Sequence, residues 1–332
     1  MPIFRILCGI AAAASLGLGA TVVQNVSVVD VASGAIRSSQ TVLLDGESIR
    51  VVDRIPHGAT VVEGRGKFLM PGLWDAHARL EGSGPRELHA LLSQGITGVR
   101  DVGTSWEAIQ SMRRQSPLRI VGSGHPVEGA NAIEARRAFD VLWEADADFV
   151  TPSANITPDG FVAMAEQARH WRVPFGGPIP PSVSPWYALE ARQITVDGIG
   201  SLKHVTDATL TRFFDQCSFW NTRFVPLLAT WRRSSPQEAN RTARVVAAAR
   251  ESKVVLLAGS GGAGGSLLAE LRELAAAGWA PQDVLRSATV APTKLWGGSD
   301  WVVLNANPLV SLDNLEQIAG VVVNGSWLPR AK

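Results

Sequence analysis

The sequence predicts an α/β fold, namely a TIM-type (β/α)₈ barrel together with a small composite β-sandwich formed by the N- and C-terminal segments. Two observations predict this fold. In the middle of the chain, eight short apolar segments typical of strands alternate with amphipathic segments typical of helices. Near both ends, Val-rich segments are instead separated by short turn signals. A length of 332 residues is sufficient for one large domain and a smaller one.

The composition is that of an ordinary globular protein, with 46% hydrophobic and 18% charged residues. The formal net charge is +1, and the sequence contains no run of lysine and arginine. A nucleic-acid-binding protein would carry a basic patch or stripe, so we expect no nucleic-acid partner. Nothing in the composition specifies an oligomeric state.

The start of the chain has the pattern of a secretory signal peptide. Residues 1–5 carry a positive charge, and residues 6–20 are apolar with small residues at their end. We therefore interpret residues 1–20 as a signal peptide and expect a periplasmic or secreted protein. An uncleaved segment would instead anchor the chain, and only then do we expect contact with a membrane. Removal of residues 1–20 leaves Cys217 as the only cysteine, so no internal disulfide is expected.

Both ends of the chain show strand and turn patterns without helices. Residues 40–44 and 48–52 flank Asp45-Gly46, and residues 318–323 and 326–328 flank Asn324-Gly325; both dipeptides are strong hairpin signals. Further strands are expected at residues 21–31, 61–62, 68–69 and 300–304. Since the two ends look alike, we assign residues 21–68 and 299–332 to the composite β-sandwich and residues 69–298 to the barrel.

The middle region supplies the alternating elements of the barrel. The expected strands span residues 69–77, 98–102, 119–122, 148–151, 173–176, 200–204, 224–228 and 254–258. The expected helices include residues 86–94, 132–145, 159–170, 185–192, 207–216, 237–252 and 266–277. A doubly wound open sheet is the alternative, but eight units favour a barrel. A barrel carries its site at the carboxyl ends of its strands, which points to His77, Asp101, His125, Thr151, Gly177, His204 and Gly261.

The segment from Pro71 to Leu80 reads Pro-Gly-Leu-Trp-Asp-Ala-His-Ala-Arg-Leu and is the most informative in the chain. Together with residues 26–30, 42–46, 95–101, 148–150, 202–204, 257–260, 288–297, 303–309 and 322–325, in this order, it resembles the amidohydrolase superfamily. The resemblance is greatest to the imidazolonepropionase-like and prolidase-like metal-dependent hydrolases. It implies a composite sandwich and a barrel in which carboxylate, imidazole and often carboxylated-lysine groups hold one or two divalent ions that activate water.

Most of the metal-binding positions that the resemblance implies are substituted in this chain. His77 and His204 match histidine ligands, whereas Arg79, Thr151, Gly177 and Gly261 replace a histidine, the bridging lysine, a histidine and the catalytic aspartate. A catalytic metal normally needs three or more protein ligands, and a guanidinium has no lone pair to offer. We therefore predict a degenerate metal site with no cofactor, or at most a divalent metal such as zinc held by His77, His125 and His204.

The leading functional hypothesis is a pseudoenzyme of hydrolase descent that is catalytically impaired or inactive. It either binds a small ligand at the barrel mouth through Arg79, His77, His125 and His204, or serves only as a scaffold. Arg79 either clamps a carboxylate or phosphate of such a ligand or pairs with Asp75 or Asp101, and both alternatives stay open. One alternative function is an active metal-dependent hydrolase of non-peptide carbon–nitrogen or ester bonds with a rebuilt mononuclear site. Another is a structural partner-binding protein. No catalytic residue is assigned from the sequence.

Overall fold

The computed structural model describes residues 20–262, 265–298 and 300–330 of the chain. The expected signal peptide lies outside the described residues except for Ala20, so its cleavage and the periplasmic or secreted location stay predictions. Within the described ranges, no helix has both the length and the apolar character that crossing a membrane requires.

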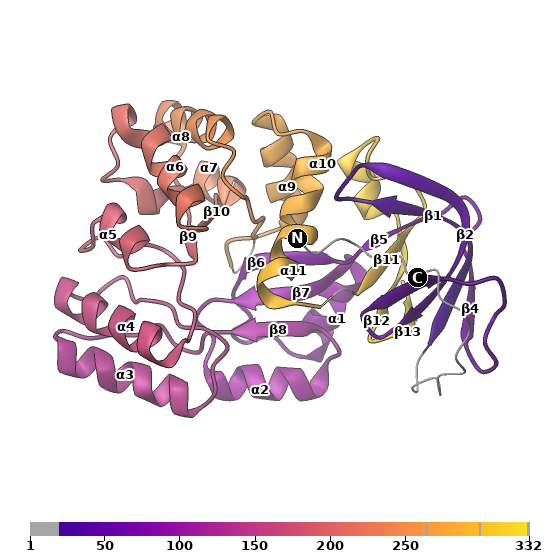
Figure 1. Cartoon of the computed structure of the whole chain (residues 1–332), viewed down its shortest axis with the longest axis horizontal. Helices are drawn as coiled ribbons and strands as arrows, with labels where there is room; N and C mark the ends of the chain where they lie inside the picture. Colours follow the sequence, from indigo (N-terminus) through magenta and orange to yellow (C-terminus); the bar gives the residue numbers. More distant parts are fainter. Residues whose placement is uncertain (1–19, 263–264, 299, 331–332) are drawn as a thin grey trace.

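Strands from the two ends of the chain form one eight-stranded sheet, with the order β13-β12-β11-β5-β1-β2-β3 and with β4 paired to β1. Figure 1 shows these early and late strands side by side at one end of the molecule. Their bounds are β1 (Thr21–Asp30), β2 (Ala35–Asp45), β3 (Ser48–Val51), β4 (Thr60–Glu63), β5 (Phe68–Pro71), β11 (Trp301–Leu304), β12 (Ile318–Val323) and β13 (Ser326–Pro329). Both expected hairpin turns are confirmed, because β2–β3 and β12–β13 pair as antiparallel neighbours. The described strands form a single sheet here, so the two-layered sandwich stays a prediction.

The middle of the chain is a mixed α/β region, as the sequence predicted. A parallel sheet has the order β6-β7-β8, formed by β6 (Leu73–Ala78), β7 (Ile96–Asp101) and β8 (Arg119–Gly122). A second parallel pair consists of β9 (Thr195–Asp197) and β10 (Arg223–Val225). Other expected strands are reduced to isolated bridges, such as Val150 with Phe175 and Phe224 with Leu256. None of these sheets is closed by itself.

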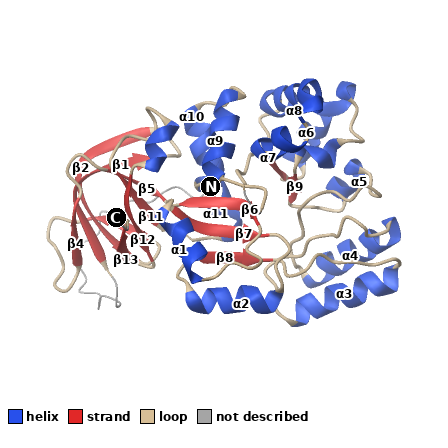
Figure 2. Ribbon diagram, turned by 180° about the vertical axis from the view of Figure 1, so that it is seen from behind, coloured by secondary structure: helices blue, strands red, loops and turns tan. Residues whose placement is uncertain are grey.

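Helices surround the central strands, as Figure 2 shows from behind. All of the helices that the sequence predicted are present, although their ends differ by a few residues. They are α1 (Pro85–Ser93), α2 (Trp106–Gln115), α3 (Ala132–Glu144), α4 (Pro158–Trp171), α5 (Pro185–Glu190), α6 (Leu210–Phe219), α7 (Leu228–Ser234), α8 (Ala239–Glu251), α9 (Leu267–Ala276), α10 (Pro281–Ser287) and α11 (Val290–Trp296). Local signals explain several starts: Thr157 accepts a hydrogen bond from Gly160 N at the start of α4, and Asn131 caps α3 in the same way.

Two of the expected strands are wrong in the structure. The expected strand at residues 69–77 is divided at Gly72 between two sheets. Gly72 N donates to Asp300 O of the terminal sheet at 2.7 Å, whereas Leu73 N donates to Gly95 O of the middle region at 2.9 Å. A Cβ at Gly72 would overlap Thr97, so the chain changes sheets where only a glycine fits.

The expected sixth strand at residues 200–204 is the second error. Residues Ile199–Leu202 form a 3₁₀ helix, and the strand lies earlier, at Thr195–Asp197. Ser201 N donates to Gly198 O and Val205 N donates to Leu202 O, so local turn bonds replace the strand ladder. The carboxyl end of this strand is therefore Asp197 and not His204.

Candidate functional site

Three side chains from three strands meet beside the carboxyl ends of β6 and β9. His77 Nδ1 lies 2.7 Å from Asp197 Oδ2, and Arg100 Nη1 donates to the same oxygen at 2.7 Å. Arg100 Nη1 also donates to Ala76 O at 3.0 Å. The strands β6, β7 and β9 thus converge on one carboxylate, which we call the Asp197 network (His77, Arg100 and Asp197).

Arg100 is the most deeply buried member of the network, with 0% exposure. Its Cζ lies 4.6 Å from the centroid of the Phe149 ring and 5.6 Å from that of Trp296, in cation–π geometry. Its Nε and Nη2 have no hydrogen-bond partner in the described part of the chain. Because a guanidinium stays charged in proteins, Arg100 places a permanent positive charge inside the Asp197 network.

The cation controls the charge of Asp197. Burial alone would raise the pKa of the Asp197 carboxyl, but the Arg100 guanidinium and the hydrogen bonds from Arg100 and His77 outweigh burial and lower the pKa to about 2. An ionised carboxylate has only acceptor atoms, so His77 Nδ1 carries the proton of this hydrogen bond. The other ring nitrogen, Nε2, then has its lone pair free when the imidazole is neutral.

His77 Nε2 is not fully sealed within the protein. The His77 side chain keeps 8% exposure, and Nε2 is not among the sealed, unpartnered atoms of the described residues. No hydrogen bond to Nε2 is formed within those residues. The ring is therefore fixed at one nitrogen and open to a ligand at the other.

Two further carboxylates, those of Asp75 and Asp101, accept hydrogen bonds from backbone groups near the site. Asp75 Oδ1 accepts from His77 N at 3.1 Å and from Ser260 N at 2.9 Å. Asp101 accepts from Leu80 N at 2.6 Å and from Thr104 N at 2.9 Å. Burial raises the pKa of both carboxyls. Both carboxylates accept from backbone N–H groups, and Asp101 Oδ2 also accepts from Thr104 Oγ1 at 2.8 Å. Neither carboxylate forms a direct ion pair with Arg79 in the described structure.

Arg79 itself is exposed and directly follows β6. Its stem lies against Gly262, where a Cβ would come within 3.4 Å of Arg79 Cγ, and its Cζ lies near Gly103, where a Cβ would be 3.7 Å away. No hydrogen bond or ion pair of its guanidinium is formed among the described residues. The charge of Arg79 nevertheless acts on Asp101, where it partly offsets the effect of burial on the pKa of the carboxyl. Both alternatives for Arg79 therefore stay predictions.

The substituted positions Thr151 and Gly177 contact each other. Thr151 is buried, its Oγ1 has no partner within the described ranges, and a Cβ at Gly177 would lie 2.8 Å from Thr151 Cγ2. Gly177 has a φ of +135°, which L side chains rarely adopt. Gly261 has a φ of +83°, and a Cβ there would lie 2.5 Å from Thr230 Oγ1. The backbone at 177 and 261 therefore suits glycine and not a ligand side chain.

The structure does not bring the three candidate histidines together. His204 is exposed on a turn beyond the 3₁₀ helix, and His125 is exposed in the loop after β8. Of the three, only His77 belongs to the Asp197 network.

The sequence analysis missed Arg100 and Asp197. The signal for Arg100 was a charged residue inside the apolar segment 96–101, and the signal for Asp197 was the short β-branched run Thr195-Val196 before it.

The residues present do not fit the metal centre that the resemblance implies. No group of three or more His, Cys, Asp or Glu side chains able to hold an ion occurs in the described ranges. Asp197 Oδ1 is buried without a partner among the described residues, but Asp197 Oδ2 already accepts bonds from His77 and Arg100. A fixed cation 2.7 Å from that oxygen also opposes a second cation by Coulomb repulsion.

No protein-family model matches the sequence, and no curated protein matches it either. Several solved structures match the fold over almost the whole chain. A Xaa-Pro dipeptidase with methionine bound in its active site has a TM-score of 0.78 at 15% identity, covering 93% of this chain and 100% of the other. A putative prolidase from Bifidobacterium longum gives 0.76 at 22% identity (95% and 96% covered), and A. niger ochratoxinase gives 0.76 at 13% (94% and 96%). The chain therefore has the fold of the amidohydrolase superfamily, as its sequence resemblance predicted.

Proposed function

We propose that this chain is a protein of hydrolase descent that has lost the metal-dependent reaction of its structural relatives and binds a small carboxylate ligand beside His77. The observation that carries the proposal is the buried Arg100 guanidinium, which pairs with Asp197 Oδ2 and opposes the binding of a second cation by Coulomb repulsion. Loss of the other positions, at Thr151, Gly177 and Gly261, leaves an ion with one imidazole nitrogen as its protein donor.

The proposal includes a closed (β/α)₈ barrel around this network. Backbone hydrogen bonds join each neighbouring pair of strand segments that the sheets leave unpaired. They are Asp148 N to Gly122 O at 3.2 Å, Val150 N to Pro174 O at 2.9 Å, Ile194 N to Phe175 O at 2.9 Å, Leu257 N to Phe224 O at 2.9 Å and Ala76 N to Ala258 O at 2.8 Å. Together with the β6-β7-β8 and β9-β10 pairs, these bonds support a ring of eight segments.

Charge and geometry favour a carboxylate as the ligand. Arg79 offers a guanidinium that forms no hydrogen bond to the described residues, although its charge acts on Asp101. Such a group binds a carboxylate through two parallel hydrogen bonds. His77 Nε2 supplies a second polar contact, from a residue near the end of β6 and two positions before Arg79. Because Arg79 is exposed, its gain over water is modest, and we expect affinities in the micromolar to millimolar range.

Calorimetry tests the ligand, with acetate, succinate and inorganic phosphate as probes. We expect heat from at least one carboxylate that Arg79→Gln removes. Arg54→Gln is the matched control, because Arg54 is an exposed arginine between β3 and β4 and outside the site. Equal loss in both variants, or no heat with any probe, would contradict the ligand proposal.

Elemental analysis tests the loss of the metal. After incubation with zinc and removal of free ions, we expect no stoichiometric zinc in the purified protein. One zinc per chain that disappears in His77→Asn would overturn this part of the proposal and favour the rebuilt mononuclear hydrolase.

One observation favours a second candidate, a hydrolase that works without a metal. The Asp197-bound His77 ring has the arrangement of a general base, with one nitrogen oriented by a carboxylate and the other free. Ester hydrolysis that persists in a chelator and is lost in His77→Gln would support this candidate. Activity unchanged by His77→Gln would remove it.

A further inference from the structure

A large cleft lies at the amino-terminal ends of β9 and β10, whereas the Asp197 network lies at the carboxyl end of β9. Arg223, the first residue of β10, lines the cleft and is aligned with Thr195, the first residue of β9. Asp197 is aligned with Val225 at the other end of the pair. The rest of the lining includes the segment up to Leu256, the loop between α9 and α10, and parts of α10 and α11. The volume of the cleft is about 840 Å³, which is within the range of small-molecule sites.

The lining of this cleft carries an excess of positive charge, and we therefore call it the basic cleft. Its cations are Arg223, Arg250, Lys253, Arg286 and Lys294, and its one carboxylate is Asp283. Five cations against one carboxylate leave a formal charge of +4, whereas the whole chain has a formal net charge of only +1. A cleft lined by charges of one sign concentrates ions of the other sign, so this cleft favours an anion.

Four of the five cations lack a carboxylate partner. Arg286 Nη1 lies 3.2 Å from Asp283 Oδ1, so this pair is nearly neutral. The other four cations form no ion pair within the described part of the chain. Arg223 and Arg250 donate instead to backbone carbonyl groups, which satisfy N–H donors but carry no net charge.

Arg223 is the clearest case of a cation without a countercharge. Its side chain is only partly exposed, and burial lowers the pKa of its guanidinium with no carboxylate to oppose the shift. Because a guanidinium nevertheless stays charged in proteins, Arg223 keeps a partly desolvated positive charge at the cleft. A bound anion would supply the missing countercharge.

The basic cleft also offers apolar surface. Val255 is 49% exposed, and Trp279 is partly exposed although it packs against the core; both residues line the cleft. An indole ring can stack on a planar base. Inorganic phosphate alone would fill a small part of the volume and would leave this apolar surface uncovered.

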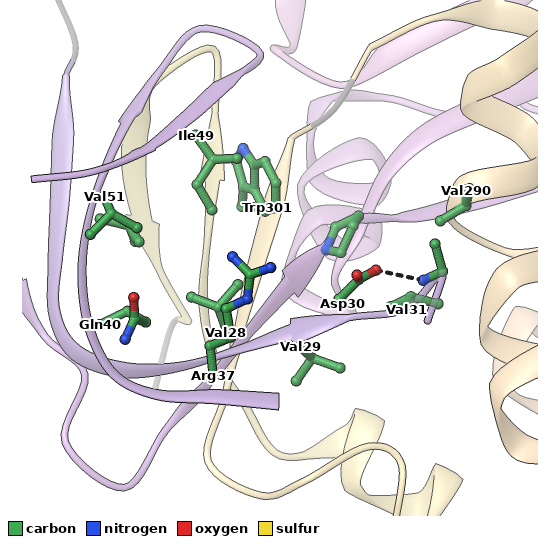
Figure 3. Close-up of a pocket in the computed structure, with 13 residues that line it drawn as sticks. Val28, Val29, Asp30, Val31, Arg37, Gln40, Ile49, Val51, Val290 and Trp301 are labelled. Carbon is green, nitrogen blue, oxygen red and sulfur yellow. Dashed lines mark hydrogen bonds between the residues drawn. The ribbon is translucent and has the colours of Figure 1, made fainter. Parts of the chain in front are cut away.

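The smaller cavity in the terminal sheet has no such excess of charge. Its volume is about 110 Å³, and its charged lining residues are Asp30 and Arg37, one of each sign. Figure 3 shows both among apolar side chains such as Val28 and Ile49. The two formal charges cancel, so the basic cleft is the better anion site of the two.

We propose that the basic cleft binds an organic polyphosphate, a small molecule in which two or more phosphate groups are joined to a planar ring system. The phosphates pair with the unpartnered cations, above all Arg223, and the ring lies against Trp279 and Val255. Two or more phosphates are required because a single one would leave much of the +4 charge uncompensated. This site is separate from the Asp197 network and does not depend on the proposed function.

Isothermal titration calorimetry of the full chain in 0.15 M sodium chloride tests the proposal. The probe is ADP, and adenosine and pyrophosphate represent its two parts. We expect saturable binding of one ADP per chain, with adenosine at least about tenfold weaker and pyrophosphate about fivefold weaker. Absence of saturable ADP binding, or equal affinity for ADP and adenosine, would overturn the proposal. Equal affinity for ADP and pyrophosphate would overturn the contact with the ring.

A charge-matched pair of double variants locates the binding. Lys253→Gln with Lys294→Gln removes two exposed charges of the cleft and is expected to weaken ADP about tenfold, with adenosine unchanged. The control, Arg54→Gln with Arg137→Gln, removes two exposed charges outside the cleft and should change the ADP affinity less than about twofold. Equal losses in both would show attraction to the net charge alone and would refute the site.

Two single variants separate the ring contact and the two proposed sites. A folded Trp279→Leu variant should bind ADP about fivefold more weakly and pyrophosphate unchanged; unchanged ADP binding would overturn the ring contact. Arg79→Gln alters the ligand site beside His77 and should leave the ADP affinity as it is. Loss of ADP binding in Arg79→Gln would instead place ADP outside the basic cleft and overturn the proposal.

Discussion

Replacement of Asp197 by asparagine tests the central claim that a buried ion pair now holds the site together. Asp197→Asn keeps the shape of the side chain and removes its charge, which leaves the fully buried Arg100 guanidinium without a counterion. Arg100 already has two nitrogen atoms without partners in the described structure. Removal of one partner of a buried pair costs about 3–5 kcal/mol, a large part of the 5–15 kcal/mol that stabilises a typical protein.

Urea denaturation followed by circular dichroism measures this loss. Asp313→Asn is the matched control, because Asp313 pairs with Arg272 on the surface, where the side chains are 68% and 45% exposed. That variant should lose less than about 1 kcal/mol. A double variant, Arg100→Met with Asp197→Leu, removes both charges and should recover much of the loss of Asp197→Asn. A loss in Asp197→Asn no larger than in Asp313→Asn would refute the reasoning.

Three further predictions follow from other parts of the fold. Burial raises the pKa of Glu270 from 4.5 to about 7, so its contribution to stability is fully present below pH 4.5 and is lost, by about 3 kcal/mol, as the pH rises through 7. Urea midpoints between pH 5 and 8 should fall with pH in the native chain and less in Glu270→Gln; equal slopes would contradict this. Gly261→Ala should cost about 1–3 kcal/mol by thermal unfolding, because it adds a contact with Thr230 to the strain of a positive φ, whereas the control Gly82→Ala meets no atom within 4 Å and should cost less. Burial raises the pKa of the Cys217 thiol, so a thiol reagent should label it only after unfolding; rapid labelling of the native chain would oppose this.

The sequence predicted those features that depend on neighbours along the chain. The Asn324-Gly325 hairpin was predictable because two residues determine that turn, and α4 because Thr157 and Pro158 provide its start. The strand at Thr195–Asp197 was not, because three residues are too few for a periodic pattern. The strand was instead expected at residues 200–204, where the structure has turns and part of a 3₁₀ helix.

The Asp197 network was beyond local patterns for a different reason. Asp197 is 120 residues from His77 and 97 residues from Arg100 along the chain. A charged residue in an apolar segment indicates burial of a charge, but it does not identify the partner. The resemblance placed His77 at the end of a strand, and the structure has it near the end of β6. It placed His204 at the end of the sixth strand, whereas that strand ends seven residues earlier, at Asp197.

The substitutions at the expected metal positions depend on one another, which explains why single reversions should not restore a metal. A histidine at 177 would meet the Thr151 methyl group, and an aspartate at 261 would meet Thr230, so each reversion requires a second change. Even with both changes, Asp197 would still be bound by Arg100. Each new metal-binding side chain would therefore lower the free energy of unfolding, and only a bound ion could offset that loss. The Arg100–Asp197 pair must be removed first, because it places a fixed, buried positive charge where the incoming ion would add another.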